Sequence, residues 1–357
     1  MPETAPIESE CGVRGFTRDD GITIRLWRPG DTPAINRFYN DPLIRPGAGH
    51  RSSRPRSDLQ WEWEFALGGR VTPAYAIAEK DKCIIGTQAY IPIPMCINGR
   101  VELTGKDEDT LVHPEFRGRG VLDDLYRLVI ERARLDRVAM LWGFTNTAVR
   151  PLERNGFKSI GTFDAMAVEL STIDAAGRRS DDASLRIEEL SNSDDRFDHY
   201  AYRLGESADG LGLYLNREFL QWRVFDNPFR EFSVLAATVD EDLVGVGIFK
   251  YEPERGCGYV SHISTVNGGS RARSETQMAL LREGLRRFHE RGLALAEARS
   301  SGGHPCNLEL RKLFALLGFK PILAKCPLEF LVRPVLEDSC AILNASNWRI
   351  CELMREY

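Results

Sequence analysis

The segment Arg117–Gly120, with the sequence Arg-Gly-Arg-Gly, is the part of the chain best suited to bind an anion. An apolar run ends just before it at Val112, and Pro114 cannot donate a hydrogen bond to a continuing strand. Apolar residues then recur at helical spacing from Val121 to Ala133. Glycines let successive backbone N–H groups surround an anion, a helix start adds partial positive charge, and arginines donate paired hydrogen bonds to phosphate oxygens. The order strand, proline, Arg-Gly-Arg-Gly, helix therefore predicts a pyrophosphate cradle rather than a solvated glycine turn.

Three consecutive carboxylates, Asp107, Glu108 and Asp109, precede this segment on the same predicted strand. Strand alternation places Asp107 and Asp109 on one face and Glu108 on the other. Like charges that share a cleft raise the pKa of a carboxyl group towards neutrality, and such a group can accept a proton from an amine. A solvated strand edge is the alternative interpretation. These three residues are the candidate catalytic bases.

Several other chemistries lack their usual sequence patterns. The eight cysteines show no CxxC spacing and the six histidines no HExxH spacing, so we expect free thiols and no metal site. The chain has no GxSxG, Walker A or strand-associated GxGxxG motif. A net charge of −5 argues against general binding to nucleic acid or anionic membranes. No apolar run is long enough for a membrane span, and the polar N-terminus is unlike a secretory signal.

The sequence repeats its landmarks in the same order at a nearly constant offset of about 160 residues. The repeated pairs are Leu59-Gln60-Trp61 with Leu220-Gln221-Trp222, Ile85-Gly86 with Val244-Gly245, and Gly156-Phe157-Lys158 with Gly318-Phe319-Lys320. A period of this length is too long for a solenoid repeat. It indicates a duplicated domain.

Each copy interleaves predicted strands with amphipathic helices, which gives an α/β fold. Consecutive strands before each main helix predict a mixed, mostly antiparallel central sheet flanked by helices. We expect a disordered segment at 1–20, a first domain at 21–170, a linker at 171–184 and a second domain at 185–357. The Arg-rich stretch Arg45–Arg56 is typical of a solvated surface loop.

The segment around Gly120 resembles the acetyl-CoA signature of the GNAT superfamily of N-acetyltransferases, Gln/Arg-x-x-Gly-x-Gly/Ala. Here it is Arg117-x-x-Gly120-x-Leu122, which departs from the pattern at its last position. The stretch from Thr145-Asn146-Thr147 to Gly156-Phe157 resembles the later motif of the family, an Asn before a helix that ends in Gly-Phe. The resemblance spans Ile22–Leu170 and is fainter from Leu185 onwards. It implies two tandem GNAT-like domains.

In that family the pantetheine arm of the donor lies between two splayed parallel strands. The resemblance implies that it pairs with the backbone near the end of the strand at Val112, and that the amine attacks the thioester from the opposite side. The donor-binding residues that it implies are Leu111, Val112, Arg117, Gly118, Arg119, Gly120, Val121, Leu122 and Asn146. No metal is implied.

Two departures bear on the chemistry. Many family members carry a Tyr four residues before the Gly-Phe pair as general acid, but here the positions hold Leu152 and Phe314. A CoA thiol resembles cysteine, with a pKa of about 8.5, and can leave without an acid. The second copy reads Asn-Gly-Gly-Ser-Arg-Ala-Arg-Ser after Val266 and lacks the Arg-Gly-x-Gly order, so we expect it not to bind the donor.

The expected function is a cytoplasmic acyl-CoA-dependent N-acyltransferase. Acetyl-CoA, or another acyl-CoA, would be the co-substrate and a small-molecule amine the acceptor. Neither nucleic acid nor membrane is an expected partner, and a homodimer is left open. The alternatives are a repurposed GNAT fold with non-transfer chemistry such as decarboxylation, and a non-catalytic CoA-binding sensor.

Overall fold

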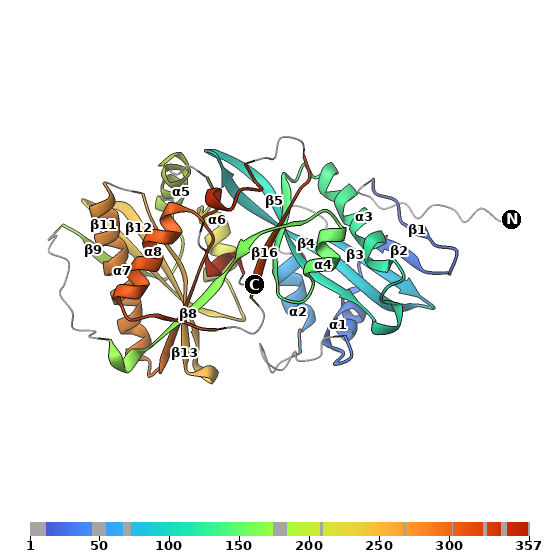
Figure 1. Ribbon diagram of the computed structural model, residues 1–357, viewed down its shortest axis with the longest axis horizontal. Coiled ribbons are helices and arrows are strands. Elements are labelled where there is room, and N and C mark those ends of the chain that lie inside the picture. The colour runs from blue at the N-terminus through green and yellow to red at the C-terminus, as the bar shows by residue number, and fades with distance from the viewer. Residues whose placement is uncertain are drawn as a thin grey trace. The chain divides into compact units, whose positions relative to one another are not determined.

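A computed structural model describes residues 12–44, 55–66, 73–173, 184–207, 210–266, 269–301, 303–323, 327–336 and 341–355. The chain forms two compact units (Figure 1). Unit 1 comprises Met1–Ile93, Leu103–Ser159 and Leu331–Ser339, and unit 2 comprises Pro94–Glu102, Ile160–Phe330 and Cys340–Tyr357. None of the helices in the described parts is long and apolar enough to cross a bilayer.

The first sheet runs in the order β1-β2-β3-β4-β5-β6-β16-β7. Its strands are β1 (Phe16–Thr17), β2 (Thr23–Leu26), β3 (Ala74–Lys80), β4 (Cys83–Ile97), β5 (Arg100–Val112), β6 (Met140–Thr145), β16 (Glu329–Pro334) and β7 (Lys158–Thr162). Strand β2 pairs antiparallel with β1 and β3, and β3 pairs antiparallel with β4, whereas β5 and β6 are parallel. In unit 2, β10 (Leu211–Leu213) pairs with the far end of β4.

The helices of this part of the chain each bury at least one apolar side chain. They are α1 (Thr32–Asn40), α2 (Asp58–Trp61), α3 (Val121–Leu135) and α4 (Val149–Arg154). Helix α3 packs on β2 and β3, with Val121, Leu125 and Leu128 fully buried. Tyr75 of β3 packs against an aromatic cluster that includes Trp61 at the end of α2. The sheet is therefore the middle layer of the unit.

The second sheet runs in the order β15-β8-β14-β13-β12-β11-β9. Its strands are β9 (Arg186–Leu190), β11 (Glu231–Val239), β12 (Asp242–Glu252), β13 (Cys257–Thr265), β14 (Leu295–Ser300), β8 (Asp164–Glu169) and β15 (Lys320–Pro321). The helices are α5 (Arg196–Ser207), α6 (Arg217–Leu220), α7 (Ser270–Glu290) and α8 (Pro305–Leu316). In Figure 1, α7 and α8 lie together over the strands, and α7 contacts β11, β12 and β13.

The two halves of the chain repeat one order of elements. The α2 helix continues as a π-helix at Glu62–Ala66, and α6 continues as a π-helix at Gln221–Phe225. A π-turn is rare, so its recurrence at the repeated Leu-Gln-Trp sequence is a strong sign of duplication. The predicted α/β fold, with two mostly antiparallel sheets flanked by helices, is confirmed.

The last strand of each half lies in the sheet of the other half. Strand β8 pairs with β14 and β15 in the second sheet, and β16 lies between β6 and β7 in the first. Leu331 of β16 is fully buried in the core beneath α3, and Met166 and Val168 of β8 are buried in the core beneath α7. The units therefore divide the chain differently from the predicted boundaries, because alternating apolar strands of this kind fit either sheet.

The prediction of a disordered segment at 1–20 is wrong for the part that the structure describes. Residues 16–17 pair with β2, and Val13 is buried in the core of unit 1. Residues 1–11 and most of the predicted linker, 174–183, lie outside the described residues.

Candidate functional site

Strands β5 and β6 part from one another at the level of the acidic residues. Their parallel ladder pairs Gly105 with Leu141 and Lys106 with Trp142. Beyond these pairs β5 continues to Val112 and β6 to Thr145. The gap predicted between two splayed parallel strands is thus present in unit 1. A strand that has parted from its neighbour can pair with an extended ligand as with an added strand.

The Arg117–Gly120 segment forms an open turn at the start of α3. Gly118 and Gly120 adopt positive φ angles of 74° and 77°, which residues with a side chain rarely adopt. A Cβ atom added at either glycine would meet nothing within 4 Å. Residues 117–120 are all exposed. The turn is therefore neither filled by side chains nor buried, which is what a cradle for an anion requires.

The helix start behind this turn is available to a ligand. The first amides of α3 lack intrahelical acceptors, as at any helix start, and they carry partial positive charge. Both carboxylates of the first turn of α3 interact with side chains outside the helix. Asp123 accepts from Asn155 at 2.9 Å, and Asp124 pairs with Arg18 at 3.0 Å. Arg18 also donates to the carbonyl oxygen of Arg119, which fixes the turn from outside.

The remaining predicted donor-binding residues flank this turn. Leu111 and Val112 lie half-buried at the end of β5, and Val112 accepts a hydrogen bond from Arg117 Nε at 3.0 Å. Val121 is buried under the first turn of α3, and Leu122 is half-buried against the core. Asn146 is exposed in the bend between β6 and α4. All of these residues therefore lie at the ends of β5 and β6 or at the start of α3.

Asp107 points towards α3 and is enclosed by donors. Its carboxylate accepts from Tyr126 Oη at 2.9 and 3.1 Å, from Gln88 Nε2 at 2.8 Å and from Thr110 Oγ1 at 3.1 Å. Burial raises the pKa of Asp107 to about 8 despite these hydrogen bonds. At neutral pH this group is mainly a buried, protonated acid. It is poorly placed to take a proton from a substrate.

Asp109 lies on the other face and is the counterion of a buried arginine. Its carboxylate is 2.7 Å from Arg56 Nη1 and accepts from Tyr75 Oη at 2.5 Å. Glu64 lies 3.7 Å from the same guanidinium, and the ring of Tyr39 stacks on it at 3.5 Å. The charge of Asp109 is thus already compensated. This arrangement favours a structural role for Asp109.

The predicted shared cleft for Asp107 and Asp109 is wrong. Asp109 has a φ angle of 51°, so the backbone of β5 turns there and breaks the alternation of faces. Asp107 therefore faces Tyr126 of α3, whereas Asp109 joins Arg56 on the opposite face. The interpretation of Arg45–Arg56 as a solvated loop also fails at its last residue, because Arg56 is 5% exposed. Residues 45–54 lie outside the described residues.

The carboxylate of Glu108 is partly exposed to solvent and has a pKa near neutrality. Its side chain is 18% exposed and forms an ion pair with the buried Lys106. Burial raises its pKa to about 7, and Asp109 and Glu64 add to the increase, while Lys106 opposes it. A general base works best when its pKa is close to the working pH. Among the three candidate carboxylates, Glu108 is the one that fits this role.

No general acid stands at the usual family position. Leu152 is 2% exposed in the core of unit 1, and Phe314 is 3% exposed in the core of unit 2. Tyr126 is also fully buried, and it uses its hydroxyl on Asp107. Burial raises the pKa of Tyr126 well above its ordinary value. The described residues form no group of three or more metal-ligating side chains.

Replacing Asp107 with asparagine is expected to flatten the pH dependence of stability. Folded Asp107 keeps its proton up to a pH of about 8, whereas in the unfolded chain it ionises near 3.8. Between these values the unfolded state binds fewer protons, so the free energy of unfolding of the wild type falls as pH rises. Between pH 5 and pH 7, we expect the free energy of unfolding of the wild type to fall by about 1–2 kcal/mol more than that of Asp107→Asn. Urea unfolding at both pH values tests this, with Asp123→Asn as control; equal slopes for wild type and Asp107→Asn would contradict it.

Replacing Arg56 with methionine is expected to destabilise the protein by about 3–5 kcal/mol. The change removes the guanidinium that faces the carboxylates of Asp109 and Glu64, which are only 5% and 8% exposed. Arg127→Met is the matched control. Arg127 is 61% exposed and pairs with Asp124 on the surface, so its loss costs less than about 1 kcal/mol. Similar midpoints of urea unfolding for the two variants would show that the Arg56 network is not a stabilising element.

Sequence reasoning missed the groups that surround the acidic strand. Gln88, Arg56 and Lys106 bind Asp107, Asp109 and Glu108 respectively. The only available signal was the placement of Lys106 two residues before Glu108 on one strand face. Nothing in the sequence signals the pairing of Arg56 with Asp109 across 53 positions.

The turn of the second copy that corresponds to Arg117–Gly120 is only partly described. Residues 267–268 lie outside the described residues, and α7 begins at Ser270 after an exposed Gly269. Gly269 has an extended conformation, with φ −63° and ψ 169°, unlike the left-handed Gly120. The two copies therefore differ at the residue that precedes the main helix.

Comparisons with known proteins connect this site to a family. Residues 35–157 match the model of the acetyltransferase (GNAT) family. The match covers the acidic residues, the Arg117–Gly120 turn and α3. No curated protein sequence matches the chain.

Solved structures match over most of the chain. A GCN5-related N-acetyltransferase from Anabaena variabilis matches with a TM-score of 0.62 and 13% identity, over 91% of this chain and 75% of that one. A probable N-acyltransferase from Enterococcus faecalis has a TM-score of 0.62 and 12% identity, over 88% and 73%. The Saccharomyces cerevisiae N-myristoyltransferase with bound myristoyl-CoA has a TM-score of 0.60 and 10% identity, over 98% and 95%. At these identities the matches establish a common fold.

Proposed function

We propose that this chain, whose residues 35–157 match the model of the acetyltransferase (GNAT) family, transfers an acyl group from acyl-CoA to an amine. The observation that carries the proposal is the open, exposed Arg117–Gly120 turn. It lies at the start of α3, beside two strands that part from one another. Acetyl-CoA is the donor that we propose, and the acceptor is a small molecule in the cytoplasm.

The donor fits unit 1 in two parts. The amides at the start of α3 and the guanidinium groups of Arg117 and Arg119 suit a diphosphate. The facing edge of β5 near Leu111 and Val112 offers backbone groups to the amides of a pantetheine arm, as an added strand would use them. Asn146, exposed at the end of β6, is a polar group on the other side of the gap.

The reaction needs a neutral amine. An alkyl amine with a pKa of about 10.4 is mostly protonated at pH 7, so a base is required. We assign this role to Glu108, which accepts the proton that the nitrogen loses. The nitrogen attacks the thioester carbon, the new C–N bond forms, and the C–S bond breaks as the thiolate leaves. No side-chain acid is required, because a thiol with a pKa of about 8.5 is a good leaving group.

The proposed acceptor face carries several charges. Lys106 and Arg56 oppose Glu64, Glu108 and Asp109, which leaves one net negative charge. This balance favours an acceptor that carries a positive charge in addition to the reacting nitrogen. The preference is small, because each cation of the group is already paired.

Two measurements test the function. Acetyl-CoA is expected to raise the melting temperature of the protein, since a ligand that binds only the folded state stabilises it. Amines incubated with protein and acetyl-labelled acetyl-CoA are then analysed by mass spectrometry. Label on an amine supports transfer, whereas loss of carbon dioxide from a carboxylated substrate with no label on any amine would support decarboxylation. Stabilisation by acetyl-CoA without turnover of any amine would instead identify a sensor.

A further inference from the structure

Unit 2 contains a pocket of about 460 Å³ at the place where its own parallel strands part. The ladder between β13 and β14 ends at Val260 and Ala298, and the two strands continue to Thr265 and Ser300. The pocket lies between the end of β13, the first turns of α7 and α8, and the C-terminal residues 346–351. Its volume is within the range of about 300–1,000 Å³ that small-molecule sites occupy.

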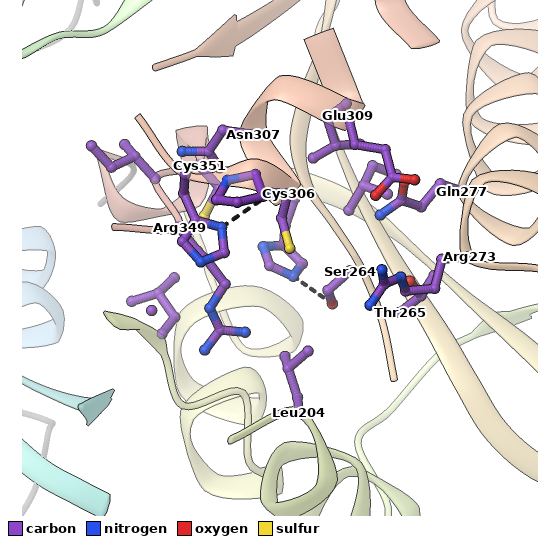
Figure 2. A pocket seen from close by; sticks show the side chains of 18 of the residues that line it. Leu204, Ser264, Thr265, Arg273, Gln277, Cys306, Asn307, Glu309, Arg349 and Cys351 are labelled. Atoms are coloured by element: carbon purple, nitrogen blue, oxygen red, sulfur yellow. Dashed lines mark hydrogen bonds between the residues drawn. The ribbon is translucent and has the colours of Figure 1, made fainter. Parts of the chain in front are cut away.

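Two arginines that form no ion pair with a carboxylate of the described residues face this pocket. Figure 2 shows Arg349 and Arg273 approaching it from opposite sides. Three of their nitrogen atoms are buried and donate no hydrogen bond to any described residue: Nε and Nη2 of Arg349, and Nε of Arg273. Burial lowers the pKa of Arg349, which is the direction expected when a guanidinium lacks a counterion. Such a group costs stability unless a ligand compensates it.

The other titratable groups of the lining leave a net charge of one. Glu309 is the single carboxylate among the lining residues, and it accepts from Ser274 Oγ at 2.6 Å. Burial and Arg349 lower the pKa of His262 to about 3, so its ring is neutral. Burial raises the pKa of the Cys306 and Cys351 thiols, which are therefore uncharged, and His304 is a neutral ring whose Nδ1 accepts from Cys306 N–H. Two arginines and one glutamate therefore give the pocket one positive charge.

Other buried polar atoms of the pocket also lack a hydrogen-bond partner among the described residues. Gln277 Oε1, Thr265 Oγ1 and His262 Nδ1 are buried with no partner in the described regions. Gln277 is 4% exposed. Native proteins leave few buried polar groups unsatisfied, and each requires an explanation. A ligand that meets several of them at once provides one. The rest of the lining includes aliphatic side chains, namely Leu204, Leu213, Ile263, Leu310 and Ile350.

We propose that this pocket binds a small organic acid, with one carboxylate held by Arg349 and Arg273 and an apolar body against the aliphatic side chains. A planar carboxylate matches the fork of a guanidinium, and a monoanion matches the single positive charge. A phosphate group fits less well. Pro305 has no N–H group and Cys306 N–H donates to His304 Nδ1 at 3.1 Å, so the first turn of α8 is already capped. All residues of this site belong to unit 2, so binding of the acid is independent of acyl transfer in unit 1.

Calorimetric titration of the full-length protein tests the ligand class. The probes are hexanoate, octanoate and phenylacetate, each with its primary amide, and inorganic phosphate. We expect at least one carboxylate to bind at least ten-fold more tightly than its amide, because hydrogen bonds to charged groups are the stronger ones. Binding of phosphate alone, equal binding of acids and amides, or no binding of any acid would overturn the proposal.

Matched arginine variants locate the site. Arg273 and Arg271 lie two residues apart on α7, but Arg271 is exposed and pairs with Glu275. Arg273→Gln and Arg349→Gln are each expected to weaken carboxylate binding about 10- to 100-fold, and Arg271→Gln to leave it unchanged. Without ligand, Arg349→Gln should melt at or above the wild-type temperature, because it removes an uncompensated buried charge. Lower melting of Arg349→Gln together with unchanged binding by both pocket variants would show a purely structural role. Gly120→Asp, which alters unit 1, is expected to bind the acid as the wild type does.

Discussion

Replacing Gly120 with aspartate is expected to abolish the stabilisation of the protein by acetyl-CoA and to lower kcat/KM by about 100-fold or more. Gly120 has a φ angle of 77° at the start of α3, and open space faces its missing side chain. An aspartate would place a carboxylate where we expect phosphate oxygens. Two such charges 4 Å apart repel by about 4 kcal/mol at an effective dielectric constant of 20, and solvent at the exposed turn reduces this value. Each 1.4 kcal/mol corresponds to about ten-fold in binding.

The controls separate charge from backbone strain. Gly99 also has a positive φ angle, 79°, with no atom within 4 Å of an added Cβ, but it lies in the turn between β4 and β5. Gly99→Asp introduces the same residue under the same backbone strain, and should leave the shift in melting temperature with acetyl-CoA intact. Gly120→Ala adds strain without charge and should give a smaller loss than Gly120→Asp. Equal stabilisation of wild type and Gly120→Asp by acetyl-CoA would remove the basis of the proposed function.

Replacing Glu108 with glutamine is expected to lower kcat by about 100- to 10,000-fold, the range that a general base contributes. Glu108 has a pKa of about 7, so the carboxylate is competent above that pH and protonated below it. The kcat of the wild type should therefore rise as pH increases through about 7. In Glu108→Gln this limb should be absent and the residual rate should follow the ionisation of the amine itself. Rates from pH 5.5 to 9 with saturating substrates test both statements.

Asp109→Asn is the informative comparison for Glu108→Gln. The two residues are adjacent, but Asp109 compensates Arg56, whereas Glu108 is partly exposed. We expect Asp109→Asn to lower the melting temperature, because it leaves a buried guanidinium with less counter-charge. The rise of kcat with pH should remain but move to lower pH, because Asp109 no longer raises the pKa of Glu108. Glu108→Gln should remove the pH dependence, and its melting temperature is not the deciding measurement because the change also removes the carboxylate paired with the buried Lys106. If Asp109→Asn instead removes the pH limb at an unchanged melting temperature, the base is Asp109 and our assignment is wrong.

The sequence predicted the parts of this protein that depend on local pattern. Three such elements are present: the strand that ends at Val112, the turn at Arg117–Gly120 and the amphipathic helix after it. Each could be predicted because its pattern lies in consecutive residues. The duplication was readable because the repeated Leu-Gln-Trp and Gly-Phe-Lys sequences keep their spacing. The predicted main helix of the second copy, Arg273–Arg291, differs from α7 chiefly at its start.

The sequence did not predict features that depend on distant residues or on one unusual backbone angle. Period-two alternation assumes a regular strand, so the left-handed conformation of Asp109 reversed the faces that we had assigned. Arg56 lies in a polar stretch, and its burial follows from Asp109 and Tyr75, residues far away in the chain. The pocket of unit 2 takes its residues from several elements, including the C-terminal segment with Arg349, and no motif connects them.

Strand β8 of the first half lies in the second sheet, and β16 of the second half lies in the first sheet. This exchange gives a reason for the chain to keep a second copy that lacks the Arg-Gly-x-Gly turn. A gene that lost the second half would encode a first sheet with a vacancy between β6 and β7, and an aliphatic core without Leu331. Selection for the first half alone is thus enough to preserve the second, whatever ligand it holds. For the same reason the peptide connection between the halves is not their only link. Proteolytic nicking between residues 174 and 183 should yield fragments that copurify and separate only in denaturant.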